Sequence, residues 1–205
     1  MLIDLLRHGQ PLGGDVLRGR IDHPLSEEGF AQMCRSTGLD ARADTGSLPW
    51  TGIYSSPLLR CRRFAEHLGE RYGLPVYIES DWQEIDYGDW DGLPLSEWRQ
   101  VAASQFRRFR DDMSALAPPN GETFVDFRER VLGAWQRVQQ LPDDSHVLII
   151  THGGVMRVIL PTVLGIPLNR TGVFDIPFAC LSRLSLSMGD RAGQGSLVFH
   201  NGRVS

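Results

Sequence analysis

The sequence has few cysteines, no long apolar run and no excess of basic residues. Cys34, Cys61 and Cys180 are its three cysteines, and they are too widely spaced for a disulfide framework or a zinc pattern, so we expect a reducing, cytoplasmic environment. No apolar stretch approaches the ~20 residues of a membrane-spanning helix, and the N-terminus lacks the features of a signal peptide. Because the net charge is -4, nucleic acid is not an expected partner. We expect neither a membrane protein nor a nucleic-acid binder.

Short apolar runs alternate along the chain with stretches of helical periodicity, which is typical of an α/β protein. No repeat or linker divides the 205 residues, a length that suits one core. The sequence predicts strands at LIDLL, GIYSS, 75–79, HVLII, 174–178, 181–186 and 197–200, and helices after residues 26, 57, 123 and 152 and over 93–113. The expected fold class is α/β, a three-layer α/β/α sandwich with a mainly parallel central sheet, forming a single domain over 1–205.

Cationic and acidic side chains follow several of these strands. Arg7 and His8 come directly after LIDLL, Arg60 lies one helical turn beyond GIYSS, and His152 comes directly after HVLII. Glu84 follows the strand at 75–79. Because open α/β sheets bind ligands beyond the carboxyl ends of their strands, we expect these five residues to converge at one rim.

These residue types suit a phosphoryl group. Arginine forks match phosphate oxygens, the amide of Gly153 at a helix start can face an anion, and a neutral imidazole can act as a nucleophile. Taken singly, each residue also has a structural interpretation. Arg60 could pair on an exposed helix, Glu84 could be one more solvated carboxylate of an acidic loop, and His152 could simply start a helix.

Five segments, LLRHGQ, SSPLLRCRRFAE, EIDYGDWDG, NGETFVDFRERV and THGGV, together resemble the histidine phosphatase superfamily, also called phosphoglycerate-mutase-like, in order and over most of the chain. The resemblance implies that His8 is phosphorylated during turnover. Arg7, Arg60 and His152 would bind the phosphoryl group, and a protonated Glu84 would protonate the leaving alcohol. It implies a small phosphorylated metabolite as substrate and no metal or other cofactor, with a helical segment at about 93–120 inserted over the active site.

Two departures from the family pattern bear on the kind of activity. Pro11 and Gly14 stand where the family has Thr or Ser and then Asn after RHG, so we expect this phosphoryl contact either to be missing or to come from Arg18 or Arg20. Mutases of the family carry a longer basic insertion in the middle of the chain. Here that stretch is short, and Arg107, Arg108 and Arg110 are expected to form a solvated helix face. A phosphatase is therefore favoured over a phosphoglycerate mutase.

The segment PLGGDVLRGRIDHPLSEEGFAQM is similar to bacterial proteins grouped with alpha-ribazole phosphatase. That similarity implies a phosphomonoesterase acting on alpha-ribazole 5'-phosphate in cobalamin biosynthesis. A phosphatase of broad specificity for sugar or nucleotide phosphates is the alternative. The oligomeric state is left open, a homodimer included.

Two other classes of protein remain as alternatives. A metal-dependent hydrolase would use Asp22, His8 and His152 as ligands, but the sequence lacks a tight His/Asp motif. A non-catalytic phosphate-binding module would need the arginines but not a proton donor such as Glu84.

Overall fold

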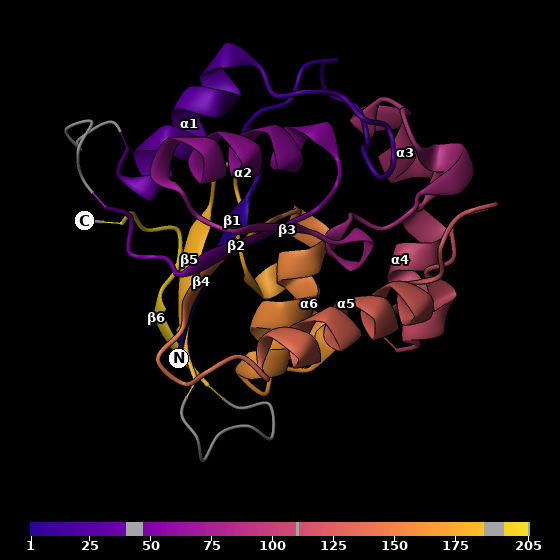
Figure 1. Cartoon of the computed structure of the whole chain (residues 1–205). Coiled ribbons are helices and arrows are strands. Elements are labelled where there is room, and N and C mark those ends of the chain that lie inside the picture. The colour runs from indigo at the N-terminus through magenta and orange to yellow at the C-terminus, as the bar shows by residue number, and fades with distance from the viewer. Residues whose placement is uncertain (40–46, 110, 187–194, 205) are drawn as a thin grey trace.

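The strands predicted at LIDLL, GIYSS and HVLII lie at the centre of a six-stranded sheet. The computed structural model describes residues 1–39, 47–109, 111–186 and 195–204, in which helices cover both faces of this sheet (Figure 1). Helices α1 and α2 cover one face, and α5 and α6 cover the other (Figure 1). The predicted three-layer α/β/α sandwich is confirmed.

The strands have the spatial order β3-β2-β4-β1-β5-β6. The pairs β3–β2, β2–β4 and β4–β1 are parallel. Strand β5 pairs antiparallel with β1, and β6 pairs antiparallel with β5. The strands are β1 (Leu2–Arg7), β2 (Gly52–Ser55), β3 (Val76–Ile78), β4 (His146–Thr151), β5 (Leu181–Ser185) and β6 (Ser196–Phe199). The helices are α1 (Glu27–Thr37), α2 (Leu59–Tyr72), α3 (Leu95–Val101), α4 (Ala103–Phe109), α5 (Phe124–Val138) and α6 (Gly153–Val163). None of these helices is long and apolar enough to cross a membrane.

Side-chain caps fix where helices α1 and α5 begin. The Ser26 hydroxyl accepts a hydrogen bond from the Gly29 amide at 3.0 Å and starts α1, as the sequence predicts. Thr123 caps α5 in the same way through the Asp126 amide. Helix α1 ends at Gly38, whose φ of 72° is a conformation that glycine adopts without strain.

The pairing of β1 with β4 brings the two predicted catalytic histidines together. Arg7, the last residue of β1, lies opposite Thr151, the last residue of β4. Because the strands are parallel neighbours, the next residue of each chain segment, His8 and His152, leaves the sheet at the same edge. The His8 amide continues the ladder by donating to the Thr151 carbonyl at 2.9 Å.

Two predictions of secondary structure are wrong. The segment 174–178 is irregular rather than a strand, because Pro177 has no N–H to donate to a ladder and the Ile176 carbonyl accepts from the Arg7 side chain. The single helix predicted over 93–113 is instead two short helices, α3 and α4, which meet at the fully buried Ala102.

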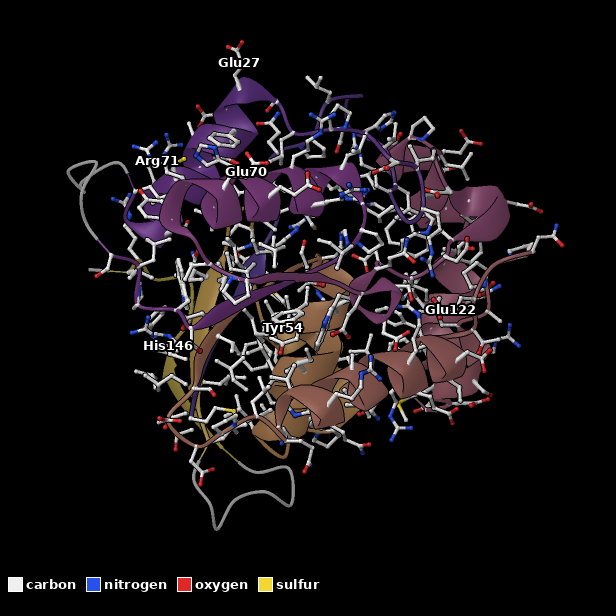
Figure 2. All side chains as sticks on the ribbon, viewed as in Figure 1. Glu27, Tyr54, Glu70, Arg71, Glu122 and His146 are labelled. Carbon is white, nitrogen blue, oxygen red and sulfur yellow. The ribbon has the colours of Figure 1, made fainter. Side chains whose placement is uncertain are left out.

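The buried carboxylate of Asp4 on β1 connects the neighbouring strands β4 and β5 through hydrogen bonds. Asp4 is fully buried and accepts two hydrogen bonds from Arg183, at 2.7 and 2.9 Å, and one from the Trp50 indole at 2.8 Å. The His146 Nε2 atom lies 3.1 Å from the same carboxylate, on the side of the molecule away from α3 and α4 (Figure 2). Burial raises the pKa of Asp4, but the hydrogen bonds from Arg183, His146 and Trp50 outweigh it, so the pKa is lowered from its ordinary value of 3.8.

Replacing Asp4 with asparagine is expected to lower the free energy of unfolding at pH 7 by about 3 kcal/mol, because Arg183 loses its counter-charge. Because the pKa of Asp4 is lower in the folded state than in the unfolded state, its ionised carboxylate stabilises the fold fully above pH ~4. This stabilisation is lost as the pH falls from about 4 through the folded-state pKa. Urea unfolding should therefore show the difference from wild type shrinking below pH ~4. As a control, Arg62→Ala, which breaks an exposed ion pair with Glu66, should cost less than about 1 kcal/mol. Equal losses in the two variants would contradict the role of Asp4.

Candidate active site

His8 is held in one tautomer at the carboxyl end of β1. Its Nδ1 atom lies 2.8 Å from the Gly9 carbonyl oxygen, an acceptor, so Nδ1 carries the proton and donates it. The Nε2 atom therefore keeps its lone pair. His8 is only 4% exposed, yet it lies in the wall of a cavity of about 420 Å³. This arrangement presents an imidazole nucleophile to whatever occupies the cavity.

His152 lies directly beside His8. The two ring centroids are 5.2 Å apart at an interplanar angle of 63°. His152 is fully buried, with its Nε2 atom 2.8 Å from the Ser56 hydroxyl and 3.6 Å from the Cys61 sulfur. Ser56 directly follows β2, the neighbour of β4, so three adjacent strands hold this pair of rings.

Two of the predicted arginines lie near enough to influence the charge of the histidines; Arg7 is on the cavity wall, whereas Arg60 and His152 lie behind it. Arg60 is fully buried at the start of α2 and donates to the carbonyls of Ile21 and Gly19, each at 2.8 Å. Arg7 is half-buried, donates to the Ile176 carbonyl at 2.6 Å and lies 4.3 Å from the Phe178 ring centroid. The Nε atoms of both arginines are buried without a hydrogen-bond partner. These unsatisfied donors make the region suited to an anion.

Burial and the neighbouring arginines keep both histidines neutral. Burial lowers the pKa of His8 well below its ordinary value of 6.5, and the charges of Arg60 and then Arg7 lower it further. The pKa of His152 is lowered in the same way, by burial and then by Arg60. Burial lowers the pKa of Arg7 to about 10, with Glu84 opposing the change, so Arg7 remains a cation at neutral pH.

We expect NMR spectroscopy of ¹⁵N-labelled protein to show His8 as a neutral ring at pH 6, with the proton on Nδ1. Because its folded-state pKa is depressed, protonation would begin only well below pH 6.5, and the loss of neutral His8 should not limit activity between pH 6 and 8. His8→Gln identifies the His8 signals. Titration of the His8 signals with a midpoint near 6.5 would contradict this expectation.

Glu84 is anchored beside the first turn of α6. Its carboxylate accepts hydrogen bonds from the Gly154 amide at 3.0 Å and from the Ile85 amide at 3.1 Å. The residue is 8% exposed and lies in the cavity wall with His8, Arg7 and Gly153. The structure therefore places a carboxyl group and an imidazole on one cavity, as a proton donor and a nucleophile require.

The rest of the cavity wall is largely apolar and aromatic. Helices α3 and α4, from the segment predicted to lie over the site, provide part of it. Burial raises the pKa of Tyr87, so its hydroxyl is neutral. The apolar and aromatic side chains of the wall are Pro11, Val16, Leu17, Ile85, Tyr87, Leu95, Trp98, Phe106, Phe109, Leu116, Phe124, Phe127 and Phe178.

Of the remaining predicted arginines within the described residues, only Arg18 lies in the cavity wall. Its guanidinium, however, donates to the carbonyls of Val16, Leu12 and Gly14 and to His23. Arg20 donates to the Gln83 side chain and lies outside the described cavity wall. Arg107 and Arg108 are exposed, whereas Arg110 lies outside the described residues. The Arg18 and Arg20 guanidiniums thus contact loops around the site.

The alternative metal site is not assembled. Within the described parts of the chain, no three His, Cys, Asp or Glu side chains gather closely enough to hold a metal ion. The Asp22 carboxylate accepts a hydrogen bond from the Leu59 amide at 2.6 Å, at the start of α2.

Three further residues contribute to the site that no pattern in the sequence singled out. Arg157 lines the cavity one helical turn after Gly153, a spacing that could have revealed it. Ser56 lies in the quoted SSPLLR segment, but nothing in the sequence shows that its hydroxyl meets His152. Phe178, 5.7 Å from the His8 ring, was expected in a strand.

The sequence pattern of the histidine phosphatase superfamily (branch 1) matches residues 3–195. The chain belongs to this superfamily, and it is a phosphatase that acts on phosphoric monoesters.

Individual relatives differ in what their names say they act on. A phosphatase of Bacillus subtilis, PhoE, is 32% identical over 89% of this chain and 87% of its own length. The adenosylcobalamin/alpha-ribazole phosphatase of Salmonella typhimurium is 26% identical over 92% of each chain. The solved structure of a mycobacterial glucosyl-3-phosphoglycerate phosphatase superimposes with a TM-score of 0.80 at 26% identity, over 99% of each chain.

Proposed function

We propose that this protein hydrolyses phosphomonoesters in two steps through a phosphohistidine at His8. The observation that carries the proposal is the hydrogen bond from His8 Nδ1 to the Gly9 carbonyl, because it leaves Nε2 unprotonated on the cavity wall. Histidine is among the side chains that form covalent intermediates, and phosphoryl transfer depends mainly on positioning and on positive charge. Arg7, Arg60 and His152 would provide that environment, with the Gly153 amide at the start of α6.

In the first step, the Nε2 lone pair of His8 attacks phosphorus as the bond to the ester oxygen breaks. Protonated Glu84 gives its proton to that oxygen, and the alcohol leaves. In the second step, a water oxygen attacks the phosphohistidine, its proton passes to the Glu84 carboxylate, and the P–N bond breaks. The products are the alcohol and inorganic phosphate, with His8 and Glu84 restored.

Phosphatase activity suits this cavity better than mutase activity. A mutase must retain a bisphosphate while the intermediate is turned over, which calls for further cations near the leaving group. The exposed Arg107 and Arg108 of α4 are not on the cavity wall. Arg18 and Arg157 are on it, but the Arg18 guanidinium donates to carbonyls of its own loop, and most of the side chains of the wall are apolar.

For the substrate, we propose alpha-ribazole 5'-phosphate, a precursor in cobalamin biosynthesis whose alcohol carries an aromatic base. The aromatic side chains Tyr87, Trp98 and Phe106 support it, since aromatic walls stack well on flat rings. The likeness to the Salmonella enzyme agrees with it. The likeness to the mycobacterial structure favours a sugar ester, glucosyl-3-phosphoglycerate, as the second candidate.

A panel of phosphate esters separates these candidates. We would measure kcat/KM for alpha-ribazole 5'-phosphate, glucosyl-3-phosphoglycerate, glucose 6-phosphate and 3-phosphoglycerate, and would assay the last for isomerisation as well. The expected result is the highest kcat/KM with the aromatic ester and no isomerisation. A preference for glucosyl-3-phosphoglycerate would overturn the proposed substrate while leaving the two-step mechanism standing.

A further inference from the structure

Four consecutive backbone carbonyls lead up to Glu84, and side chains bind all of them. Arg130, on α5, donates through Nη1 to the carbonyls of Asp81 and Gln83, both at 2.9 Å, and through Nη2 to that of Glu84 at 3.0 Å. The Thr151 hydroxyl donates to the fourth, that of Trp82, at 2.7 Å. One guanidinium group thus holds three of the four carbonyls.

Glu122 keeps the Arg130 guanidinium in this position. Its two carboxylate oxygens accept from Arg130 Nε at 2.6 Å and from Nη2 at 2.8 Å, and both side chains are largely buried, 17% and 14% exposed. Glu122 lies on the side of the molecule that holds α4 and α5 (Figure 2). Its backbone amide donates to the Asp86 carbonyl at 2.9 Å, so Glu122 also contacts the chain just after Glu84. A buried guanidinium group in a bidentate pair with a carboxylate keeps a fixed orientation.

Glu84 is consequently fixed at both ends. Its backbone is held by Arg130, and its carboxylate is held by the Gly154 amide of α6. The segment that carries it, after the short helical turn at Ser80–Trp82, has no strand or helix of its own to set its path. Without Arg130, three carbonyls near the cavity would lose their partner, and the segment could shift relative to α6.

We propose that Arg130 is a positioning residue for the catalytic acid. It does not touch the substrate, and it acts by holding the backbone that presents the Glu84 carboxyl to the cavity. This inference rests on the proposed role of Glu84 in the two-step reaction. Because Arg130 would act through proton donation by Glu84, replacing Arg130 should reduce the rate most for esters whose leaving group needs a proton.

The test compares Arg130→Met with a matched control, Arg137→Met, on the same helix. Arg137 also contacts the segment, but through the side chains of Glu79 and Asp81 and not through its backbone. Two esters are used: 2-phenylethyl phosphate, whose alkoxide must be protonated, and 2,4-dinitrophenyl phosphate, whose phenolate leaves unaided. The measured quantity is kcat/KM, which reports the steps up to phosphorylation of His8.

Arg130→Met is expected to lower kcat/KM about 100-fold for the phenylethyl ester and less than about 5-fold for the dinitrophenyl ester, in line with the worth of general acid catalysis. Arg137→Met should change both by less than about 2-fold. Arg130→Lys, which keeps a charge but cannot span three carbonyls, should lower the phenylethyl rate about 10-fold. If Arg130→Met does not fold, Arg130→Lys alone decides the question.

Equal slowing of both esters in the folded Arg130 variants, or slowing of neither, would overturn the positioning role. The proposed function fails in a different way, because the His8→Asn variant would then keep substantial activity or Glu84→Gln would slow both esters equally. If Glu84→Gln slows the phenylethyl ester selectively but Arg130→Lys does not, the positioning role of Arg130 alone is refuted.

Discussion

Replacing His8 with asparagine is expected to lower kcat for phosphomonoesters by about 10⁵-fold, the scale typical of losing a covalent nucleophile. Asparagine keeps a polar side chain of similar size at this buried site, but it cannot form the phosphorylated intermediate. The control is Gln140→Ala, a polar change at an exposed position just after α5 and outside the cavity wall, which should leave kcat unchanged. Circular dichroism would confirm that both variants fold.

The intermediate itself gives a second readout of the same prediction. Wild-type protein quenched during turnover should contain phosphate in an acid-labile, base-stable linkage, and the His8 variant should contain none. Substantial activity in His8→Asn would remove His8 as the nucleophile. A wild-type protein that binds phosphate esters but never becomes labelled would point to a phosphate-binding module instead.

Glu84→Gln is expected to lower kcat/KM for 2-phenylethyl phosphate by about 10³-fold and for 2,4-dinitrophenyl phosphate by less than about 10-fold. The amide fills the same space beside the Gly154 amide, but it has no acidic proton for the leaving oxygen. The sensitive measurement is the ratio of the two kcat/KM values, because it cancels changes that affect both esters equally.

Asp81→Asn is the matched control for Glu84, since it removes a carboxylate from the same segment. The Asp81 side chain is partly exposed and pairs with Arg137, outside the cavity wall. This variant should leave the ratio of the two esters unchanged. Equal slowing of both esters by Glu84→Gln would assign the acid role to another group.

The sequence predicted the centre of the site well because strand ends carry it. A short, mainly apolar run followed by a polar pair places Arg7 and His8 at a sheet edge, and the same reasoning applies to His152, which follows HVLIIT. Glu84 was harder, because Asp81, Asp86 and other acids surround it in the chain and only the fold shows which carboxylate is buried.

Other parts could not be predicted, because they depend on the directions of side chains and on loop paths. Arg18 was one of two candidates for a phosphoryl contact, and its guanidinium donates to three carbonyls of its own loop, whose path a sequence does not reveal. The segment ending at Phe178 has a strand's apolarity, but Pro177 interrupts it and the aromatic ring lies over Arg7. The contact of Ser56 with His152 depends on how β2 and β4 align, which no local pattern encodes.

The alignment of β1 with β4 has a consequence for how the molecule can fail. His8 and His152, 144 positions apart in the chain, directly follow β1 and β4, the two central strands of the sheet. The ladder from Leu2–His146 to Arg7–Thr151 holds these two strands together. Fraying at the outer strands β3 and β6 leaves that ladder whole, whereas separating the imidazoles requires the middle of the sheet to open, which is a global event. As the urea concentration rises, enzyme turnover and the protection of the β1 amides from hydrogen exchange should therefore be lost at the same concentration.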